Sequence, residues 1–372
     1  MKIVFLAPTD SSHTIKWANS LSEHGIKVLV YGLKKSYKTE FHKDIIIEEL
    51  DVPAEVISKK GGSLSKLIYL KAYPQIKHIL KTFKPNLLHA HYATSYGLLG
   101  ALTGFHPFVL SVWGSDVFTF PQRSLVHKTL FKYNLNKADK ILSTSRFMAE
   151  RISKYTTKKI EVTPFGVDLE KFYPHKELKL FEGEGNIIIG TIKGLEKVYG
   201  IEYLIDAFVL LKKRNENKKI KLLIVGDGSL KSLILKRIEG SLYRDDILLT
   251  GKVKFTEVYK YHNVLDIYIA ISIMDDESFG VAVLEASACE KPVIVSNVGG
   301  LPEVVVNEVT GFLVPAKDPI FTSLKIEELI NDQELRMRMG KAGREFVDKN
   351  YNWESSINQM IKIYHELLGN KK

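Results

Sequence analysis

The stretch KIVFLAPTDSSHTIKWANSLSEHGIKVLVYG, residues 2–32, contains the alternation that decides the fold. Its first part, KIVFLAP (2–8), is almost continuously apolar, as expected of a β-strand buried on both faces. A segment with apolar residues at helical spacing follows and ends at Gly25, a residue type that commonly terminates helices. KVLVYG (27–32) then predicts a second strand. Strand, helix and strand in this order predict a parallel α/β sheet with helical crossovers.

The same alternation recurs along the chain and is interrupted once. Residues 170–186 are polar, contain a proline and two glycines, show no period, and therefore predict an interdomain linker. Strands are predicted before it at NLLHAH (86–91), FVLSVW (108–113), KILSTS (140–145) and KIEVTP (159–164), and after it at NIIIGTI (186–192), IKLLIVG (220–226), ILLTGKV (247–253), DIYIAIS (266–272), PVIVSN (292–297) and, at the edge, GFLVP (311–315). The pattern predicts two Rossmann-like domains whose strand-carboxyl ends face a cleft, because open α/β sheets bind ligands at those ends.

Composition narrows the class of protein. A chain of 372 residues exceeds what one hydrophobic core usually holds, which favours two domains. Cys289 is the single cysteine, so no intrachain disulfide can form and a cytoplasmic location is expected. The first apolar run is too short for a signal peptide, and no stretch reaches the ~18 apolar residues of a membrane span. The first strand of each half is not followed by G-x-G-x-x-G, which counts against a dinucleotide cofactor.

The net charge of +10 is concentrated in the first half of the chain. Residues 1–170 carry 24 Lys and Arg against 14 Asp and Glu, whereas residues 171–372 carry 29 of each. Residues 56–115 contain no acid. Within them, residues 59–84 hold seven lysines and apolar residues at roughly helical spacing, with Pro74 starting or kinking a second helix. Two ordinary surface helices explain this stretch, and so does a face toward an anionic membrane or a lipid-diphosphate acceptor.

The stretch ESFGVAVLEA (277–286) places two glutamates around a predicted helix start. The N–H groups of the first helical residues, together with the helix dipole, form an anion site. In this interpretation the helix begins at Ser278, Phe279, Gly280 and Val281 and runs to about Cys289. Glu277 then accepts bonds from sugar hydroxyls, while Glu285, ~8–9 Å deeper along the axis, binds a ribose diol. Lys193 and Lys197, after the first strand of this half, are the cations available to a diphosphate.

This arrangement resembles the retaining nucleotide-sugar glycosyltransferases of family 4, which have the GT-B fold. The resemblance covers most of the chain and includes FGVDLEKF (165–172), VGDGSL (225–230), ESFGVAVLEA, VGGLPEVV (298–305) and TGFLVP (310–315). It implies that Glu277 contacts the donor sugar, that Phe279, Gly280 and Val281 offer backbone donors, and that Glu285 binds the ribose. It further implies that Lys193 neutralises the diphosphate and that the region of Val253 holds the base.

Two positions depart from the family pattern. Family members commonly have a lysine directly before the glycine that opens the next helix, whereas Tyr199 precedes Gly200 here, so Lys197 has to substitute. Many members also carry a histidine where SVWGSD (111–116) has Trp113, which can stack and donate an N–H but cannot accept a proton. Loss of catalysis is conceivable on this ground.

For the reaction we expect attack on the same face of the sugar, with the leaving diphosphate accepting the proton of the acceptor hydroxyl. The protein then supplies positioning and charge stabilisation, with Glu277, Lys193 and Lys197 as the catalytic residues. Double displacement with Glu277 as the nucleophile is the alternative. Asp275 and Asp276 read as solvated loop acids, so neither a metal nor a cofactor is expected beside the nucleotide-diphosphate sugar.

Acceptor-side candidates lie at strand ends of the first half and in the loops after them. They are His13, His91, Trp113 and Asp116, together with His89; for each of them a core or capping role is an equally good explanation. The expected domains are 1–170, with about 353–372, for the acceptor, and 171–352 for the donor. As in the family, the last helix, from about Trp353 to Leu368, is expected to cross back to the first domain.

The predicted function is therefore transfer of a sugar from a nucleotide-diphosphate sugar to a hydroxyl, in cell-surface polysaccharide or glycolipid biosynthesis. The expected partners are the nucleotide sugar, a lipid-linked or glycan acceptor and an anionic membrane surface, with no nucleic acid. The location is cytoplasmic or peripheral on the inner face of the membrane. Two alternatives remain: a catalytically inactive sugar-nucleotide or lipid-binding protein, and a nucleotide-sugar epimerase, which shares the two-domain architecture.

Overall fold

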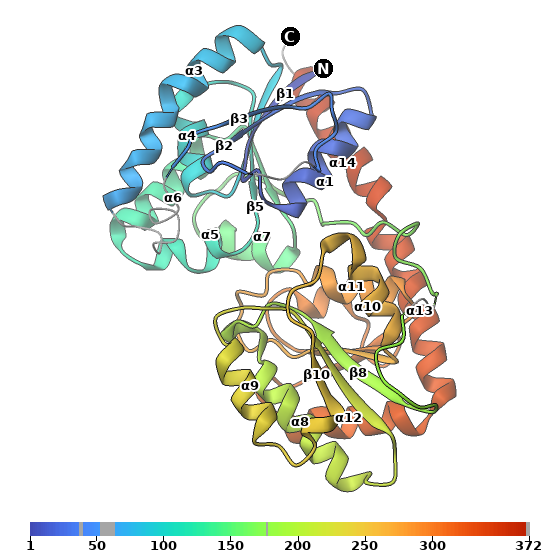
Figure 1. Ribbon diagram of the computed structural model, residues 1–372. Helices are drawn as coiled ribbons and strands as arrows, with labels where there is room; N and C mark the ends of the chain where they lie inside the picture. Colours follow the sequence, from blue (N-terminus) through green and yellow to red (C-terminus); the bar gives the residue numbers. More distant parts are fainter. Residues whose placement is uncertain (37–39, 53–63, 176–177, 370–372) are drawn as a thin grey trace. The chain divides into compact units, whose positions relative to one another are not determined.

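The computed structural model describes residues 1–36, 40–52, 64–175 and 178–369. Contacts divide the chain into two compact units (Figure 1). Unit 1 comprises Met1–Pro164 and Ser356–Lys372, and unit 2 comprises Phe165–Ser355. The division after Pro164 precedes the predicted one at residue 170 because Val167 pairs with the end of the second unit. The N–H of Val167 donates to the carbonyl of Tyr351 at 2.7 Å, and the carbonyl of Val167 accepts from the N–H of Trp353 at 3.0 Å.

The described part of unit 1 is built on a seven-stranded sheet in which every pairing is parallel. The strand order is β3-β2-β1-β4-β5-β6-β7. The strands are β1 (Lys2–Leu6), β2 (Lys27–Gly32), β3 (Ile46–Glu49), β4 (Leu87–His91), β5 (Phe108–Val112), β6 (Lys140–Ser143) and β7 (Ile160–Val162). β3 was not predicted, because an edge strand with exposed residues lacks the apolar run of the buried strands.

Helices cover the sheet of unit 1 and bury apolar residues against it. They are α1 (Ser12–Glu23), α3 (Ala72–Phe83), α4 (Ser95–Thr103), α5 (Ser115–Phe118), α6 (Leu125–Lys137), α7 (Arg146–Ser153) and α14 (Trp353–Gly369), with 3-10 turns η1 (Leu64–Lys71) and η2 (Phe120–Gln122). Pro74 lies in the first turn of α3, where its missing N–H costs no helical bond. Residues 59–63 of the predicted lysine-rich helices lie outside the described residues.

The last helix returns to unit 1 as predicted. α14 buries Ile357, Met360, Ile363 and Tyr364, and the side chain of Gln359 donates to the carbonyl of Val162 at 3.0 Å. The C-terminal segment is thus part of the first unit although the second unit lies before it in the sequence.

Unit 2 repeats the architecture with a six-stranded parallel sheet in the order β10-β9-β8-β11-β12-β13. The strands are β8 (Ile187–Ile192), β9 (Ile220–Val225), β10 (Ile247–Leu249), β11 (Ile267–Ala270), β12 (Val293–Ser296) and β13 (Gly311–Val314). The helices are α8 (Ile201–Arg214), α9 (Lys231–Glu239), α10 (Val258–Val264), α11 (Val281–Ala288), α12 (Pro319–Asn331) and α13 (Gln333–Tyr351), with 3-10 turns η3 (Lys197–Tyr199), η4 (Arg244–Asp246), η5 (Phe255–Glu257) and η6 (Leu301–Val304).

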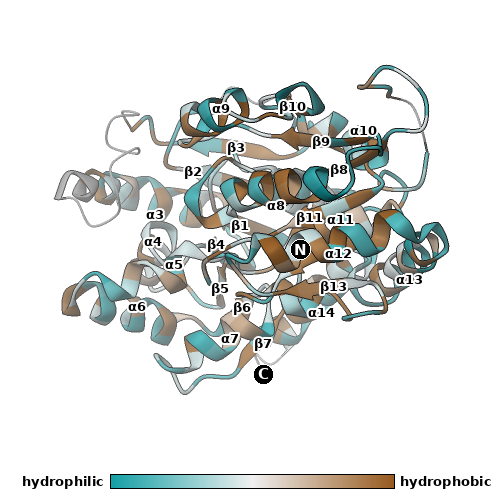
Figure 2. Ribbon diagram, turned by 90° about the horizontal axis from the view of Figure 1, so that it is seen from below, coloured by the Kyte–Doolittle hydropathy of each residue, from teal (hydrophilic) through white to brown (hydrophobic). Residues whose placement is uncertain are grey.

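Hydropathy follows this layering. In Figure 2 the strand ribbons are mostly coloured as hydrophobic, whereas several helices alternate between hydrophobic and hydrophilic stretches. Each unit has its own core of buried aliphatic and aromatic side chains. Among the described residues, the structure contains no helix with the length and hydropathy needed to span a bilayer.

Candidate active site

Both sheets reverse their strand order next to the first strand of the unit. In unit 1 the reversal lies between β1 and β4, and in unit 2 between β8 and β11. Open α/β sheets bind ligands at such switch points, outside the carboxyl ends of the strands. Most of the predicted site residues lie in the segments that follow these four strands, so the topology brings them to the two places where a ligand is expected.

The partly buried Lys193 and the buried Glu277 form an ion pair at the switch point of unit 2. Lys193 follows β8, and its Nζ lies 2.6 Å from Oε2 of Glu277, in the segment after β11. Ser272 donates to the same oxygen at 3.1 Å, and both side-chain bonds of Glu277 to described residues therefore involve Oε2 and leave Oε1 without one. Burial lowers the pKa of Lys193, but the Glu277 carboxylate, together with Tyr268 and Tyr199, raises that pKa above its ordinary value. The lysine is therefore a cation at neutral pH, and one carboxylate oxygen is open to a hydroxyl donor.

The helix after Glu277 begins later than predicted. α11 starts at Val281, and Ser278, Phe279 and Gly280 belong to the preceding loop, so the predicted start at Ser278 is wrong. The reason is Gly280, whose φ of +100° is incompatible with a right-handed helix. A Cβ at this position would also lie 2.8 Å from Cδ2 of Leu301. Glu285 is consequently about one turn into the helix, ~6 Å along its axis from Val281, and not nearly two turns.

The backbone around Glu277 is held by the loop that follows β12. Gly300 donates its N–H to the carbonyl of Glu277 at 2.8 Å. A Cβ on Gly299 would lie 2.1 Å from that carbonyl oxygen, and a Cβ on Gly300 would lie 2.2 Å from the carbonyl oxygen of Ser278. The two glycines of VGGLPEVV are therefore required by close backbone contact, and they fix the segment that presents Glu277.

Glu285 lies in α11 beside a histidine that the sequence did not single out. Nε2 of His262, in α10, lies 3.3 Å from Oε2 of Glu285, and both side chains are buried. Nδ1 of His262 is buried without a hydrogen-bond partner in the described chain. No described residue bonds to Oε1 of Glu285. This carboxylate is thus oriented through one oxygen and open at the other, like that of Glu277.

Tyr199 occupies the position where the family pattern has lysine. Its ring lies under the ammonium group of Lys193, with 4.7 Å between Nζ and the ring centroid. The aromatic ring therefore supports the neighbouring cation through a cation–π contact. Lys197, which was expected to substitute, is exposed on η3 and does not belong to the hydrogen-bonded group around Glu277.

The remaining predicted residues of unit 2 have ordinary surroundings. Val253 is half-buried in the loop between β10 and η5. Phe279 is buried in an aromatic cluster, with ring centroids 6.2 Å from Phe165 and 5.6 Å from Tyr351. Asp275 and Asp276 lie in an exposed turn, as expected of solvated loop acids. Within the described ranges, no three His, Cys, Asp or Glu side chains converge as a metal site would require.

The switch point of unit 1 gathers aromatic rings. Trp113, after β5, lies 4.4 Å from His91 and 6.0 Å from His13 between ring centroids. Tyr92 packs against the same indole at 5.0 Å. Burial, with the neighbouring His89 and His13, lowers the pKa of His91 well below its ordinary value. Nδ1 of His91 is buried and has no hydrogen-bond partner among the described residues. The structure thus brings three of the acceptor-side candidates together.

Asp116 is committed to the backbone. Its Oδ2 accepts from the N–H of Ala93 at 2.7 Å, and its Oδ1 accepts from the N–H groups of Trp113 and Gly114 at 3.2 and 2.9 Å. The carboxylate is 1% exposed, and burial raises its pKa while these donors offset part of the effect. Asp116 therefore joins the loops after β4 and β5, which is the capping role that the sequence left open.

His89 is a satisfied buried imidazole. Nδ1 lies 2.7 Å from the hydroxyl of Tyr364 in α14, and Nε2 lies 2.7 Å from Oγ of Ser111 in β5. Burial lowers the pKa of His89 to about 3. Each hydroxyl can donate or accept, so a neutral ring satisfies both bonds in either tautomer. His89 connects the returning helix to the sheet.

The chain is similar to known proteins over nearly its whole length. The family described as Glycosyl transferase 4-like matches residues 2–145, and the family described as Glycosyl transferases group 1 matches residues 175–346. An uncharacterized glycosyltransferase of Methanocaldococcus jannaschii is 31% identical over 95% of this chain and 93% of its own length. Sucrose-phosphate synthase from Thermosynechococcus elongatus superimposes with a TM-score of 0.81 over 100% of both chains at 20% identity. HepE of Anabaena in complex with UDP-glucose gives 0.78 over 98% of this chain and 100% of its own at 17% identity.

The two doubly wound sheets have the GT-B fold, as the similar solved structures show. The chain belongs to the family-4-like glycosyltransferases.

Proposed function

We propose that the protein transfers a hexosyl group from a nucleotide-diphosphate sugar to a hydroxyl acceptor with retention of anomeric configuration. The observation that carries this proposal is the Lys193–Glu277 ion pair, in which Oε1 of the carboxylate has no bond to a described residue. A sugar diphosphate needs a cation for its leaving group and an acceptor for its hydroxyls. This pair supplies both at the switch point of one sheet.

Unit 2 is assigned to the donor. The diphosphate lies against Lys193 and the first N–H groups of α11, which have no intrahelical partners. The sugar hydroxyls donate to Oε1 of Glu277. The ribose diol donates to Glu285, whose other oxygen His262 orients, and the base lies toward Val253. Support for a nucleotide sugar also comes from HepE, whose structure contains UDP-glucose.

The proposed reaction follows from the position of the cation that can stabilise the leaving diphosphate. The acceptor hydroxyl forms a bond to the anomeric carbon on the face from which the diphosphate departs, and a diphosphate oxygen takes the hydroxyl proton. Lys193 is cationic and largely buried, so it stabilises the negative charge that develops on the diphosphate more strongly than an exposed lysine would. No step in this scheme requires a metal or a second cofactor. Double displacement by Glu277 is less well supported, because Lys193 and Ser272 both donate hydrogen bonds to its carboxylate and so make it a weaker nucleophile.

Unit 1 is assigned to the acceptor. His13, His91 and Trp113 form an aromatic cluster at its switch point, and the half-buried rings of His13 and Trp113 suit stacking on a sugar ring. We infer a glycan or lipid-linked acceptor and a cytoplasmic enzyme of cell-surface polysaccharide or glycolipid biosynthesis. The cationic composition of this unit supports that acceptor class.

A hydrolysis and transfer assay tests the proposal. A panel of UDP-, GDP- and ADP-sugars is first ranked by thermal shift, since ligands that bind the native state raise its stability. The best donor is then incubated with methanol as a small hydroxyl acceptor, with and without EDTA. We expect slow release of free sugar and a methyl glycoside with the donor's anomeric configuration, unchanged by EDTA. Epimerised donor would favour the epimerase, and binding without turnover would favour the inactive binder.

A further inference from the structure

The first turn of α6 exposes two branched apolar side chains. Leu125 is 81% and Val126 75% exposed, whereas Phe131, Asn134 and Leu135 of the same helix are buried. Ser124 caps the helix by accepting from the N–H of His127. Exposed large apolar residues that lie singly on a surface need no explanation, whereas an adjacent pair forms a small apolar patch that a partner can cover.

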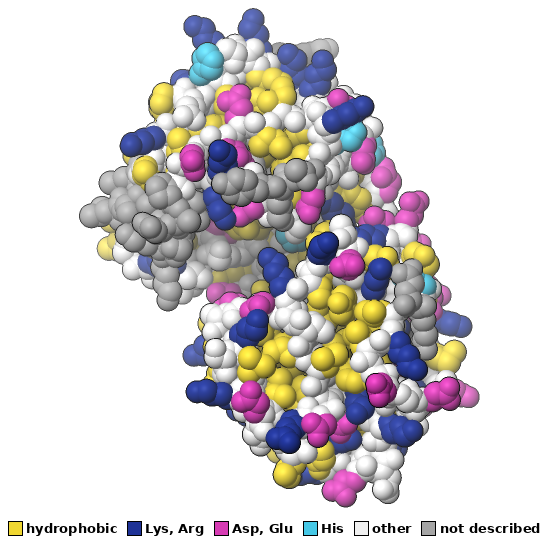
Figure 3. Space-filling model, in the orientation of Figure 1, with side chains coloured by type: hydrophobic (Ala, Val, Ile, Leu, Met, Phe, Trp, Pro, Cys, Tyr) yellow, Lys and Arg dark blue, Asp and Glu magenta, His cyan; other side chains and the backbone are white. Residues whose placement is uncertain are grey.

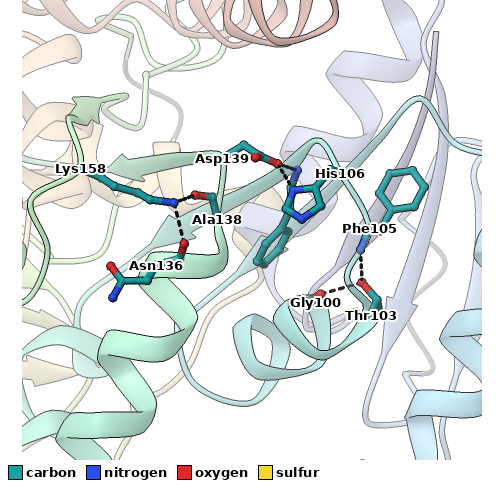
Figure 4. Close-up of polar contacts among 9 residues, drawn as sticks. Gly100, Thr103, Phe105, His106, Asn136, Ala138, Asp139 and Lys158 are labelled. Carbon is teal, nitrogen blue, oxygen red and sulfur yellow. Dashed lines mark hydrogen bonds and ion pairs between the residues drawn. The ribbon is translucent and has the colours of Figure 1, made fainter. Parts of the chain in front are cut away.

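The exposure does not result from a loosely held helix. The side chain of Asn134 donates to the carbonyl of Ala93 at 2.8 Å in the core. At the other end, Nζ of Lys158 donates to the carbonyls of Asn136 and Ala138 at 2.6 and 2.5 Å (Figure 4). These bonds satisfy carbonyl groups that a helix C-terminus leaves open. The pair at the first turn is therefore presented by a fixed helix.

The acidic and basic residues of α6 itself are all lysines, apart from His127. Lys128 and Lys132 are exposed and follow Leu125 at helical spacing, on the same side of α6. Between residues 56 and 138 the single acid is Asp116, which is buried and bonded to the backbone. Asp139, at the end of this stretch, accepts from the N–H of Phe108 and lies 2.7 Å from Nδ1 of His106 (Figure 4).

Further cations lie on the neighbouring helices of the same layer, toward the strand-amino end of the sheet, because α3 and α4 end where β4 and β5 begin. α4 packs against both α6 and α3, and α3 exposes Lys77, Lys81 and His78. A pocket of about 530 Å³ lies between the end of α3 and the end of α4, lined by Lys77, His78, Leu80, Lys81, Thr103, Gly104 and Phe105. Figure 3 shows Lys, Arg and His side chains gathered at the end of unit 1 where Figure 1 places the end of α3.

We propose that this layer of unit 1 docks on an anionic lipid bilayer, with Leu125 and Val126 entering the interface and Lys128 and Lys132 contacting lipid phosphates. Apolar insertion and attraction to anionic headgroups add, as in amphipathic helices that lie in the membrane plane. Two apolar side chains are too few for the core of a stable protein interface, which buries on the order of 1,000 Å² or more. They are enough to anchor a cationic surface in a bilayer reversibly.

The position of the turn gives the docking a consequence for the acceptor. β5 is followed by α5, η2 and then α6, so the first turn of α6 lies at the strand-carboxyl end of unit 1. The aromatic group around Trp113 lies at the same end. Docking would therefore bring the acceptor side to the membrane. This consequence rests on the proposed function, whereas the docking itself does not.

Co-sedimentation with vesicles tests the docking. Vesicles of phosphatidylglycerol and phosphatidylcholine are compared with phosphatidylcholine alone, at low and high salt. We expect salt-sensitive binding to the anionic vesicles, reduced about 25-fold by K128Q/K132Q at roughly fivefold for each lysine. L125S/V126S should reduce it about tenfold or more, because each buried apolar side chain contributes to insertion.

Matched controls come from unit 2. R338Q/K341Q removes two exposed cations from α13, and L242S removes an exposed leucine that precedes Asp245 and Asp246. Both controls should bind vesicles like the unaltered protein. Binding that ignores K128Q/K132Q, or that falls equally with R338Q/K341Q, would show attraction by net charge alone and overturn the proposal.

A fluorescent probe tests the insertion directly. Cys289 is fully buried and burial raises its pKa to about 12, so a cysteine introduced on the surface can be labelled selectively. An environment-sensitive dye on L125C should shift to the blue with anionic vesicles, and the same dye on L242C should not. A shift on L125C that depends on protein concentration without vesicles would indicate self-association and overturn the membrane assignment.

The outcome can be separated from that of the proposed function. Donor hydrolysis without an acceptor requires no membrane, so L125S/V126S should hydrolyse the donor at the unaltered rate. Failure of vesicle binding with normal hydrolysis removes the docking surface and leaves the glycosyltransferase chemistry. Vesicle binding without hydrolysis removes that chemistry and leaves the docking surface.

Discussion

The switch points of the two sheets have the same topology and opposite chemistry. In unit 2, Lys193 and His262 each meet a buried carboxylate, and each carboxylate keeps one oxygen open. In unit 1, the pKa values of the buried histidines are lowered, and the carboxylate of Asp116 is used by backbone N–H groups. The same doubly wound fold therefore carries an ion-paired site in unit 2 and an aromatic cluster in unit 1. A few side chains in the segments after the central strands decide which of the two is formed.

The largest expected effect is loss of turnover when the charged pair is broken. Lys193→Ala and Glu277→Gln should each lower kcat by about 10²–10³-fold, the range seen when one group that stabilises transition-state charge is removed. Donor affinity should change less, because the contacts tighten as the sugar becomes cationic. Steady-state kinetics of donor hydrolysis measures both quantities. Mild effects of both changes on KM alone would contradict the assignment of the pair.

Removing the buried carboxylate of Asp116 in unit 1 should lower the stability of the fold and should not act on the reaction directly. Asp116→Ala leaves the N–H groups of Ala93 and Gly114 buried without an acceptor, which should cost about 3 kcal/mol of unfolding free energy. Urea unfolding measures the loss. Asp10→Ala, which removes a partly exposed carboxylate paired with Lys34, is the control and should cost under ~1 kcal/mol. An Asp116→Ala protein of normal stability but no turnover would make Asp116 a reacting group.

The sequence predicted the frame of both switch points but not their internal bonding. Apolar runs and their spacing predicted the strands of the two sheets except the edge strand β3, and the family resemblance predicted the returning helix. The two units divide after Pro164, before the predicted linker at 170–186. The start of α11 was missed because the sequence does not show that Gly280 has a positive φ, nor that a side chain at this position would meet Leu301. Tyr199, Ser272 and His262 were missed as site residues because they meet Lys193, Glu277 and Glu285 only through the fold.

Glu285 tests whether the second carboxylate of unit 2 serves the donor. Glu285→Ala leaves a ribose diol unpaired in a buried place, so donor Kd should rise about 10- to 100-fold, equivalent to ~1–3 kcal/mol. Titration of the nucleotide diphosphate without the sugar measures this directly, since the sugar contacts of Glu277 are then absent. An unchanged Kd for the nucleotide would place the ribose elsewhere.

The stability of the protein should fall in acid because His89 and His91 are buried in the neutral form in unit 1. The pKa of His89 in the folded protein, about 3, lies below the ordinary 6.5, so the unfolded chain binds more protons at intermediate pH. The stability that His89 contributes is complete above pH 6.5 and is lost as pH falls toward 3, at up to ~1.4 kcal/mol per pH unit. His91 adds to the loss in the same direction. Replacing His89 by Gln should flatten the pH dependence of unfolding between pH 6.5 and 4, and an unchanged slope would contradict this account.

The exposed pair in α6 marks another limit of sequence reasoning. The residues around Leu125 contain apolar side chains at several spacings, and the burial of Phe131 and Leu135 decides which side of the helix faces solvent. The same limit applies to the lysines, since charge runs show where cations are but not which of them share a face. The acid-free composition predicted an anionic partner, and the fold adds an apolar contact point to it.

Replacing Lys197 should have the smallest effect on turnover of these changes. The replacement therefore tests whether Lys197 belongs to the charged site. The sequence makes Lys197 the substitute for the lysine that Tyr199 replaces, whereas the structure places it exposed on η3, and solvent screens exposed charges strongly. Lys197→Ala should therefore lower kcat by about fivefold or less, corresponding to under ~1 kcal/mol. Tyr199→Leu, which removes the ring beneath Lys193, should cost about as much through the lost cation–π contact. Both are measured by donor hydrolysis beside Lys193→Ala. Near-normal activity of Lys193→Ala with an inactive Lys197→Ala would mean that the donor diphosphate is held by the exposed lysine and that the buried pair only stabilises the fold.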